Sequence, residues 1–178
     1  MKVVSNNLLD VLEIFPPRFK DNRGFFSVPY NKELFKKMSI PSEYVQDNES
    51  FSTAGVLRGL HFQTGEHAQA KLVRVIKGRV QDVIVDLRLD SPTHGEWGSF
   101  ILSADVGNML YVPRGFAHGF LALEDSIFTY KVDNGYCKEA ESGIRWDDPD
   151  LAIEWMHNPM IISDKDQELP SYIDLTTS

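Results

Sequence analysis

Residues 55–63 read Gly-Val-Leu-Arg-Gly-Leu-His-Phe-Gln, so that five residues separate the first glycine from His61. Lys71 and Gly78 follow downstream, with six residues between them. Short β-like segments bounded by turn residues surround this block, and regular short strands of this kind favour a sandwich or barrel over a helical fold. We therefore expect an all-β architecture, with His61 on one of its strands.

A second block, residues 107–118, also has glycines at set distances before a histidine. Gly107, Pro113 and Gly115 precede His118. Together the two blocks resemble the paired motifs of the cupin superfamily. Metal-binding cupins place His-x-His and a glutamate in the first block and one histidine in the second. Here the second histidine is Gln63 and the glutamate position is Lys71, whose ammonium has no free lone pair for a cation. The resemblance implies a jelly-roll barrel that keeps the pocket and binds no metal.

The pattern along the chain predicts where the strands lie. Residues 71–76 and 79–88 flank Lys77-Gly78 and are expected to form a hairpin. In the second of these segments apolar and charged residues alternate, so its charges are expected to reach solvent or a polar cavity. Further strands are expected at residues 97–102, 109–112, 116–123 and 127–132.

Other signals predict the remaining local structure. Asn31 is expected to cap a short helix that runs through Met38, with Leu34, Phe35 and Met38 on one side. Residues 147–150 indicate a turn and residues 163–167 a polar loop. His67, His94 and His157 lie in polar or turn-like contexts and are expected at the surface.

Size and composition limit the possible classes of protein. The 178 residues fit a single domain spanning residues 1–178, and 42% hydrophobic with 25% charged residues is ordinary globular material. A net charge of −8 argues against nucleic-acid binding. The single cysteine, Cys137, cannot form an internal disulfide, and no signal peptide or membrane-spanning stretch is evident. We expect a cytoplasmic protein with no membrane partner.

The residues around His61 suggest proton transfer next to a carbonyl. A neutral imidazole is a competent base at neutral pH, and Lys71 with His118 could stabilise the oxyanion that forms. Arg58 and His61 would face opposite sides of a strand unless a bulge intervenes, which Gly59 permits. Tyr130 is a candidate acid if it points inward; a barrel-strand tyrosine with its hydroxyl in water is the alternative. For each histidine alone, a core residue bonded to a backbone carbonyl is the alternative.

Six strings spread over nearly the whole chain resemble the dTDP-4-dehydrorhamnose 3,5-epimerase family: residues 19–26, 46–50, 55–63, 71–73, 113–120 and 163–166. The most specific are Arg-Gly-Leu-His-Phe-Gln at 58–63 and Gly-Phe-Ala-His-Gly-Phe at 115–120. Members of that family epimerise C3 and C5 of dTDP-4-dehydro-6-deoxyglucose, which yields dTDP-4-dehydro-L-rhamnose, without metal or cofactor. They are homodimers of jelly-roll subunits. The resemblance implies the same substrate, product and assembly here.

The resemblance also implies roles, position by position. His61 would be the base, oriented by Asp166, and Tyr130 the acid on the opposite face of the sugar, with Lys71 and His118 beside the C4 oxygen. Tyr136 would stack on thymine. The remaining substrate-binding residues would be Arg23, Gln46, Asp47, Asn48, Arg58, Glu141 and Lys165. The chain departs from the family at Val28, where a glutamate is common.

Three alternatives remain. A C3-only epimerase or a 3,4-ketoisomerase acting on a related nucleotide sugar would use much the same residues. A metal-dependent cupin dioxygenase would need at least three protein ligands, and Gln63 and Lys71 are unsuitable. A non-catalytic cupin would bind sugar or nucleotide without exchanging protons with solvent.

Overall fold

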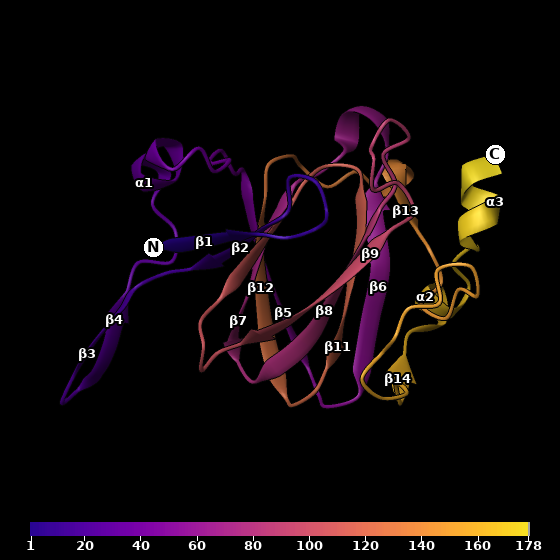
Figure 1. Cartoon of the computed structure of the whole chain (residues 1–178). Helices are drawn as coiled ribbons and strands as arrows, with labels where there is room; N and C mark the ends of the chain where they lie inside the picture. The colour runs from indigo at the N-terminus through magenta and orange to yellow at the C-terminus, as the bar shows by residue number, and fades with distance from the viewer. Residues whose placement is uncertain (178) are drawn as a thin grey trace.

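The computed structural model describes residues 1–177 and has two antiparallel sheets that face each other, as expected for an all-β jelly roll (Figure 1). The first sheet has the order β1 (Lys2–Ser5), β2 (Leu12–Phe15), β10 (Met109–Val112), β7 (Lys71–Lys77), β12 (Ser126–Val132) and β5 (Gln46–Ser52). The second has the order β13 (Glu141–Gly143), β6 (Val56–Gln63), β11 (Phe116–Ala122), β8 (Arg79–Asp86) and β9 (Trp97–Ser103). The two-residue strand β14 (Ile161–Ile162) pairs with β6 in parallel.

The strands expected in the second half of the chain are confirmed to within a residue or two, but the hairpin predicted around Gly78 is wrong. β7 pairs with β10 and β12, whereas β8 pairs with β9 and β11. Gly78, at φ +77°, therefore joins one sheet to the other. A tight glycine turn is compatible with either outcome, and the burial of both strands in opposite layers decides between them.

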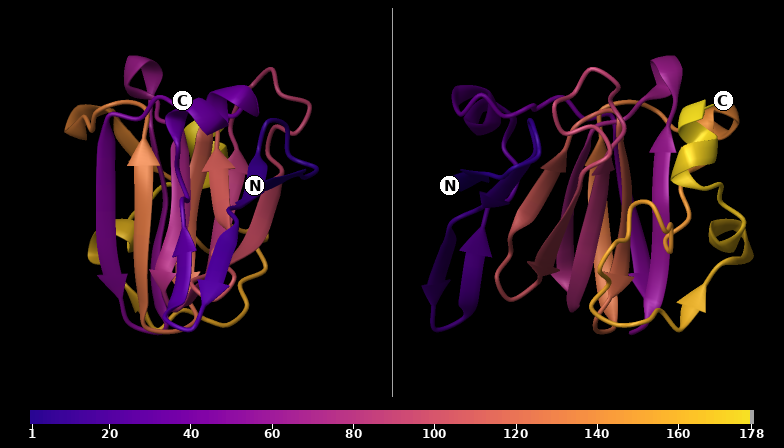
Figure 2. Two further views of the ribbon diagram at one scale, coloured as in Figure 1. Left: turned by 90° about the vertical axis from the view of Figure 1, so that its left-hand side faces the viewer. Right: turned by 45° about the vertical axis from the view of Figure 1, so that its right-hand side comes forward.

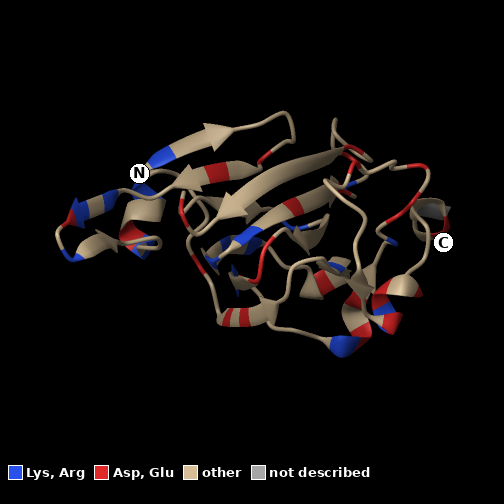
Figure 3. Ribbon diagram, turned by 90° about the horizontal axis from the view of Figure 1, so that it is seen from below, with Lys and Arg blue, Asp and Glu red and all other residues tan. Residues whose placement is uncertain are grey.

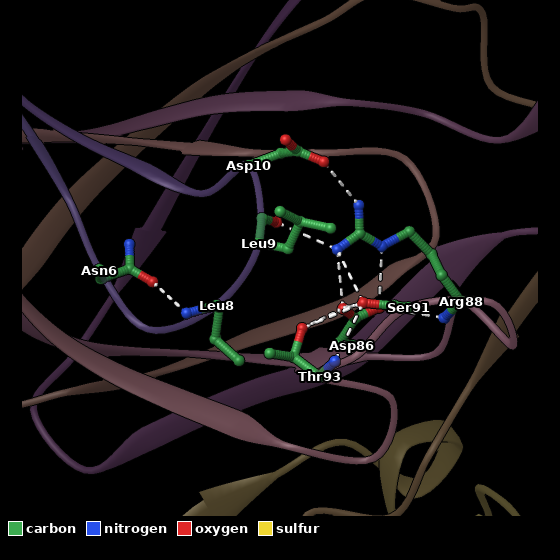
Figure 4. A network of polar contacts seen from close by, with 8 residues as sticks. All are labelled: Asn6, Leu8, Leu9, Asp10, Asp86, Arg88, Ser91 and Thr93. Carbon is green, nitrogen blue, oxygen red and sulfur yellow. Dashed lines mark hydrogen bonds and ion pairs between the residues drawn. The ribbon is translucent and has the colours of Figure 1, made fainter.

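The charges of β8 were expected to reach solvent or a polar cavity, and this is wrong for Asp86, because both faces of the strand are covered, whereas Asp82 meets His118 at the polar cavity. Asp82 and Asp86 are 0% exposed. Asp82 contacts His118, and Asp86 lies in a polar network with Arg88, Ser91 and Thr93 that also involves the N-terminal loop (Figure 4). Buried carboxylates are tolerated where hydrogen-bond donors compensate them.

The helices are short. α1 (Lys32–Lys37) begins where predicted, since the Asn31 side chain accepts the Leu34 N–H, although Leu34 is 36% exposed and only Phe35 is fully buried. Residues 163–167, predicted as a loop, contain α2 (Asp164–Gln167), whose cap is Ser163. The other helical elements are η1 (Gly65–His67), η2 (Lys138–Ala140) and α3 (Tyr172–Thr177).

The segment after β14 returns along β6, so that α2 and β6 are neighbours on one side of the barrel (Figure 2). His94, expected at the surface, instead meets the C-terminal helix, and its Nε2 lies 3.1 Å from the Tyr172 hydroxyl. Among residues 1–177, no helix is long and apolar enough to cross a membrane.

A hairpin of β3 (Arg18–Asp21) and β4 (Gly24–Ser27) extends away from the barrel on the side opposite to the C-terminal elements (Figure 1). It carries both basic and acidic segments (Figure 3). It also exposes three aromatic side chains, Phe19, Phe25 and Phe26, at 62%, 56% and 65%. An apolar surface of this kind is rarely left in water.

The main core lies between the two sheets and consists of Val73, Val75, Ile84, Phe116, Phe120, Phe128 and their neighbours. Side chains alternate along a strand, so residues separated from these by an even number of positions also point inward. Lys71, His118 and Tyr130 satisfy this rule on β7, β11 and β12. The core therefore ends in a polar cavity.

Candidate active site

A cavity of about 430 Å³ opens between the sheets. Its walls come from β5, β6, β7, β11, β12 and the C-terminal segment. Of the thirteen residues proposed from the sequence, ten line it: Asn48, Arg58, His61, Lys71, His118, Tyr130, Tyr136, Glu141, Lys165 and Asp166.

β6 has a bulge at Gly59, which the sequence permits, and it puts Arg58 and His61 on the same wall. His61 pairs with His118, but Arg58 pairs with Phe120, so β6 has one more residue than β11 over this interval. Gly59 has φ +117°, and a Cβ there would lie 2.5 Å from Gly119 Cα. Only glycine fits this close approach of the two strands.

His61 forms a pair with Asp166, a residue 105 positions later in the chain, through an Nε2–Oδ1 contact of 2.7 Å. The second carboxylate oxygen accepts the Gly59 N–H at 3.2 Å. Burial raises the pKa of the Asp166 carboxyl, but hydrogen bonds from His61 and Gly59 outweigh it and hold that pKa below its usual range. The ionised carboxylate thus fixes the ring with Nε2–H as donor, which leaves the Nδ1 lone pair as the basic atom.

Lys71 is 8% exposed and donates to the backbone carbonyl of His61 at 3.1 Å. Burial lowers the pKa of its ammonium to about 8, although Asp82 and Glu141 act in the opposite direction. Lys71 is therefore still largely protonated at pH 7. Among the described residues, the His61 carbonyl is the only acceptor of a hydrogen bond from this ammonium, so its other two N–H groups remain available to a ligand.

His118 is buried at the base of the cavity, and its Nε2 lies 2.9 Å from Asp82 Oδ2. Burial lowers the pKa of this imidazole, against the attraction of Asp82. The other oxygen of Asp82 is buried and has no hydrogen-bond partner among the described residues. Lys71 and Asp82 also interact electrostatically, so a cation, an imidazole and a carboxylate share one poorly solvated region.

Tyr130 approaches from the sheet opposite to His61. Its ring lies 6.1 Å from that of Phe128, a core residue two positions earlier on β12, so the inward orientation is the one adopted. Burial raises the pKa of its phenol, although Arg58 acts in the opposite direction. A phenol with a raised pKa keeps its proton at neutral pH.

The mouth of the cavity has a short polar chain of side chains. The Tyr136 hydroxyl donates to Glu141 Oε2 at 2.9 Å, and Lys165 Nζ lies 2.7 Å from the same oxygen. Burial raises the pKa of Glu141, but Lys165 and Tyr136 more than compensate and lower it overall. Tyr136 itself is 56% exposed, so much of this residue is open to solvent.

Three of the residues proposed from the sequence lie outside this cavity. Arg23 is in the β3–β4 hairpin and pairs with Asp21 at 2.6 Å. Gln46 donates to Asn48 at 2.7 Å, and Asp47 pairs with Lys131 at 2.7 Å on the outer face of the first sheet. None of the three is among the residues that line the cavity.

Sequence reasoning missed Asp82 and Gln63 as members of the site. An acidic residue within an apolar strand was a signal for Asp82, but alternation alone cannot say which donor it meets. Gln63 was considered only as a lost metal ligand. Among residues 1–177, no group of three or more His, Cys, Asp or Glu side chains is arranged to hold a metal ion.

The fold and the cavity define a cupin-type jelly roll with two His–Asp pairs and a buried lysine at its centre. Comparison with known proteins agrees with this class. A family model described as dTDP-4-dehydrorhamnose 3,5-epimerase matches residues 5–174. The enzyme of that name from Shigella flexneri is 46% identical over 98% of this chain and 97% of its own length.

Solved structures extend the comparison. A dTDP-4-dehydrorhamnose 3,5-epimerase from Bacillus anthracis, with TDP and PPi bound, is 48% identical, with a TM-score of 0.93 over 96% of this chain and 98% of that chain. A 3′-monoepimerase from Streptomyces bikiniensis is 29% identical, with a TM-score of 0.87 over 93% and 85%. The chain belongs to the dTDP-4-dehydrorhamnose 3,5-epimerase family and is an isomerase.

Proposed function

We propose that this chain epimerises C3 and C5 of dTDP-4-dehydro-6-deoxyglucose and so forms dTDP-4-dehydro-L-rhamnose. The proposal rests mainly on the pair formed by His61 and Asp166, whose Nε2 and Oδ1 atoms lie 2.7 Å apart. Both residues line the same cavity as Lys71, His118 and Tyr130. The C4 carbonyl acidifies the protons on both neighbouring carbons. One base and one acid therefore serve both steps if the ring shifts between them.

His61 removes the proton through Nδ1, because Nε2 is engaged by Asp166. Negative charge then develops on the C4 oxygen. Lys71, with His118 beside it, stabilises this oxyanion as a donor in a region of low solvation, where such contacts are strong. Burial lowers the pKa of His118, and the single N–H of its neutral imidazole is engaged by Asp82, so the ammonium of Lys71 supplies both the charge and the hydrogen bond.

Tyr130 returns a proton to the opposite face of the sugar. Two features support this role: the phenol lies on the sheet facing His61, and burial raises its pKa. A single base that removed and returned the proton would regenerate the same stereocentre. An acid on the opposite wall allows inversion.

The mouth of the cavity suits a nucleoside diphosphate. The exposed face of Tyr136 is available to stack on thymine, and Lys165, Arg58 and Asn48 offer donors for phosphate and sugar oxygens. Glu141 holds Tyr136 and Lys165 in place through its two contacts. No protein-bound cofactor is required by this scheme.

We also propose a homodimer. The β3–β4 hairpin exposes three phenylalanines, and a second cavity of about 400 Å³ lies on the outer face of the first sheet, with Leu72, Arg74 and Ile76 in its lining. A hairpin from a partner subunit seated on this face would cover both apolar surfaces. It would also bring Arg23 toward the partner's ligand and would account for the distance of Arg23 from its own cavity.

The assembly can be tested by sedimentation. A dimer mass is expected for the wild type, and Phe25→Ser with Phe26→Ser should shift it toward the monomer. A monomeric wild type would refute the dimer.

The free thiol of Cys137 supports a reducing, cytoplasmic location, which cell fractionation would check.

The activity is tested by deuterium uptake from heavy water with dTDP-4-dehydro-6-deoxyglucose as substrate. We expect exchange at both C3 and C5, with unchanged turnover after exhaustive chelation, and loss of exchange in His61→Ala. Exchange at neither carbon would refute the proposal, and substantial exchange in His61→Ala would remove this residue from the role of base.

A C3-only epimerase is the second candidate, and the similarity to a 3′-monoepimerase is the observation that favours it. Because the fold is shared, the fold does not discriminate between one and two epimerised centres. Exchange at C3 alone would identify this activity, and a product with a displaced carbonyl would identify a ketoisomerase. Val28, where family members commonly have glutamate, is the residue to restore first in that event.

A further inference from the structure

Gln63 occupies the position where metal-binding cupins have the second histidine of their pair. It follows His61 by two residues on β6, so both side chains project from the same side of the strand into the cavity. Gln63 is only 6% exposed. A buried amide in this place needs hydrogen-bond partners.

The amide oxygen of Gln63 accepts the backbone N–H of Cys137 at 2.9 Å. Cys137 directly follows Tyr136, whose exposed ring stands at the cavity mouth. A residue two positions from the catalytic imidazole therefore holds the turn that presents Tyr136.

A second glutamine in the cavity wall holds the other end of this turn. Gln69 Nε2 donates to the carbonyl of Asn134 at 2.8 Å. Gly135, between the two anchored residues, is exposed and has no atom within 4 Å of an added Cβ. Residues 134–137 are thus held by side-chain hydrogen bonds: those of Gln63 and Gln69 from the cavity wall, that of Asn134 to the Glu66 carbonyl and that of Tyr136 to Glu141.

We propose that Gln63 is a positioning residue that ties the loop of residues 134–137, which carries Tyr136, to β6, the strand that carries His61. The nucleotide is thereby held at a fixed position relative to His61. The proposal rests on the function proposed above, in which Tyr136 stacks on thymine. A loop fixed in advance spares the ligand the entropy of ordering it. Gln63 then acts on affinity through Tyr136 and leaves the proton-transfer step unaltered.

The test is a double-mutant cycle with dTDP as the binding probe. Gln63→Met keeps the side-chain length but removes the acceptor, and it should raise the Kd for dTDP and the KM by about five- to tenfold. The kcat should stay within about twofold, and its pH profile should be unchanged. In a Tyr136→Ala background the same substitution should change the Kd by less than about twofold, because the residue through which it acts is gone.

Gln69→Met provides a second test if Gln63→Met folds poorly. It should also raise the Kd for dTDP, and this effect should again become smaller in the Tyr136→Ala background. Lys37→Met, an exposed change outside the cavity, is the control and should leave the Kd unaltered. Fully additive effects of Gln63 and Tyr136, or an unchanged Kd in Gln63→Met, would overturn the inference. Wild-type deuterium exchange, measured in parallel, reports on the proposed function separately, because the binding cycle does not depend on turnover.

Discussion

Asp82 and Asp86 lie four residues apart on β8 and are both 0% exposed, yet their surroundings differ completely. Asp86 accepts hydrogen bonds from the backbone and guanidinium of Arg88 and from the hydroxyls of Ser91 and Thr93 (Figure 4). Burial raises the pKa of Asp86, but these donors outweigh it and lower that pKa to about 2. This carboxylate is fully compensated.

Asp82 has one partner, the imidazole of His118, and its second oxygen has none among the described residues. A buried acceptor left unsatisfied costs roughly 1–3 kcal/mol. The contrast teaches that the same residue type on one strand can serve stability or chemistry, according to how completely its oxygens are bonded. The incomplete shell lies next to the catalytic cavity, where departures from full satisfaction are expected.

The largest effect is expected on the stability of the protein when Asp86, whose carboxylate oxygens are both hydrogen-bonded, is removed. Asp86→Ala leaves Arg88 half-buried without its main partner and should lower the free energy of unfolding by about 3–5 kcal/mol. Chemical denaturation measures this change, and the kcat of the folded fraction should stay the same. The nearby exposed Asp90→Ala is the control. Because the pKa of Asp86 is lowered, its contribution is present above about pH 4 and lost as the pH falls toward 2, so the variant should lack this acid-sensitive part.

Asp82→Asn should affect catalysis and not stability, which is the reverse of Asp86→Ala. The free energy of unfolding should change little, and kcat should fall about 10–100-fold, because the charged partner of His118 is lost. Asp82 also raises the pKa of Lys71. The basic limb of the pH–rate profile should therefore move to lower pH, since Lys71 loses its proton more readily. Steady-state kinetics between pH 6 and 10 would measure both effects. An unchanged kcat would remove Asp82 from the catalytic arrangement.

A smaller effect is expected on stability in Lys71→Met. The pKa of Lys71 falls from 10.5 to about 8 through burial, so the unfolded chain binds more protons between these values and stability rises with pH across that window. Below about pH 8 the buried charge destabilises the fold in full. Removing it should raise the free energy of unfolding at pH 7 by ~1–3 kcal/mol and flatten the rise above pH 8. The exposed Lys37→Met should do neither, and a less stable Lys71→Met would contradict the assignment.

Local signals predicted much of the fold. Strand positions between residues 97 and 132 and the Asn31 cap follow from alternation and turn chemistry, and the freedom of Gly59 permits the bulge that the structure has. The turn at Gly78 was misjudged because the same residues suit a hairpin and a crossing between sheets. Residues 163–167 were misjudged because a polar segment with a serine cap suits both a loop and a single helical turn.

The candidate site shows the same division. Motif spacing alone indicated His61, Lys71 and His118, and the loss of suitable metal ligands at Gln63 and Lys71. Arg23 was assigned by resemblance, but the structure places it in a projecting hairpin outside the cavity, where it pairs with Asp21. Asp166 as the partner of His61 was implied by the resemblance alone, and neither this partner nor Asp82 could be derived from local pattern.

The amino-acid sequence by itself determined a chain of short strands with two histidines and a lysine at cupin-like spacing, because side-chain alternation and turn preferences act over a few residues. Only the tertiary structure decided that Asp166, 105 residues downstream, meets His61 and that Asp82 lies beneath His118 with an oxygen left over. Such contacts arise when two sheets pack face to face, and the free energy of that packing is distributed over the whole core.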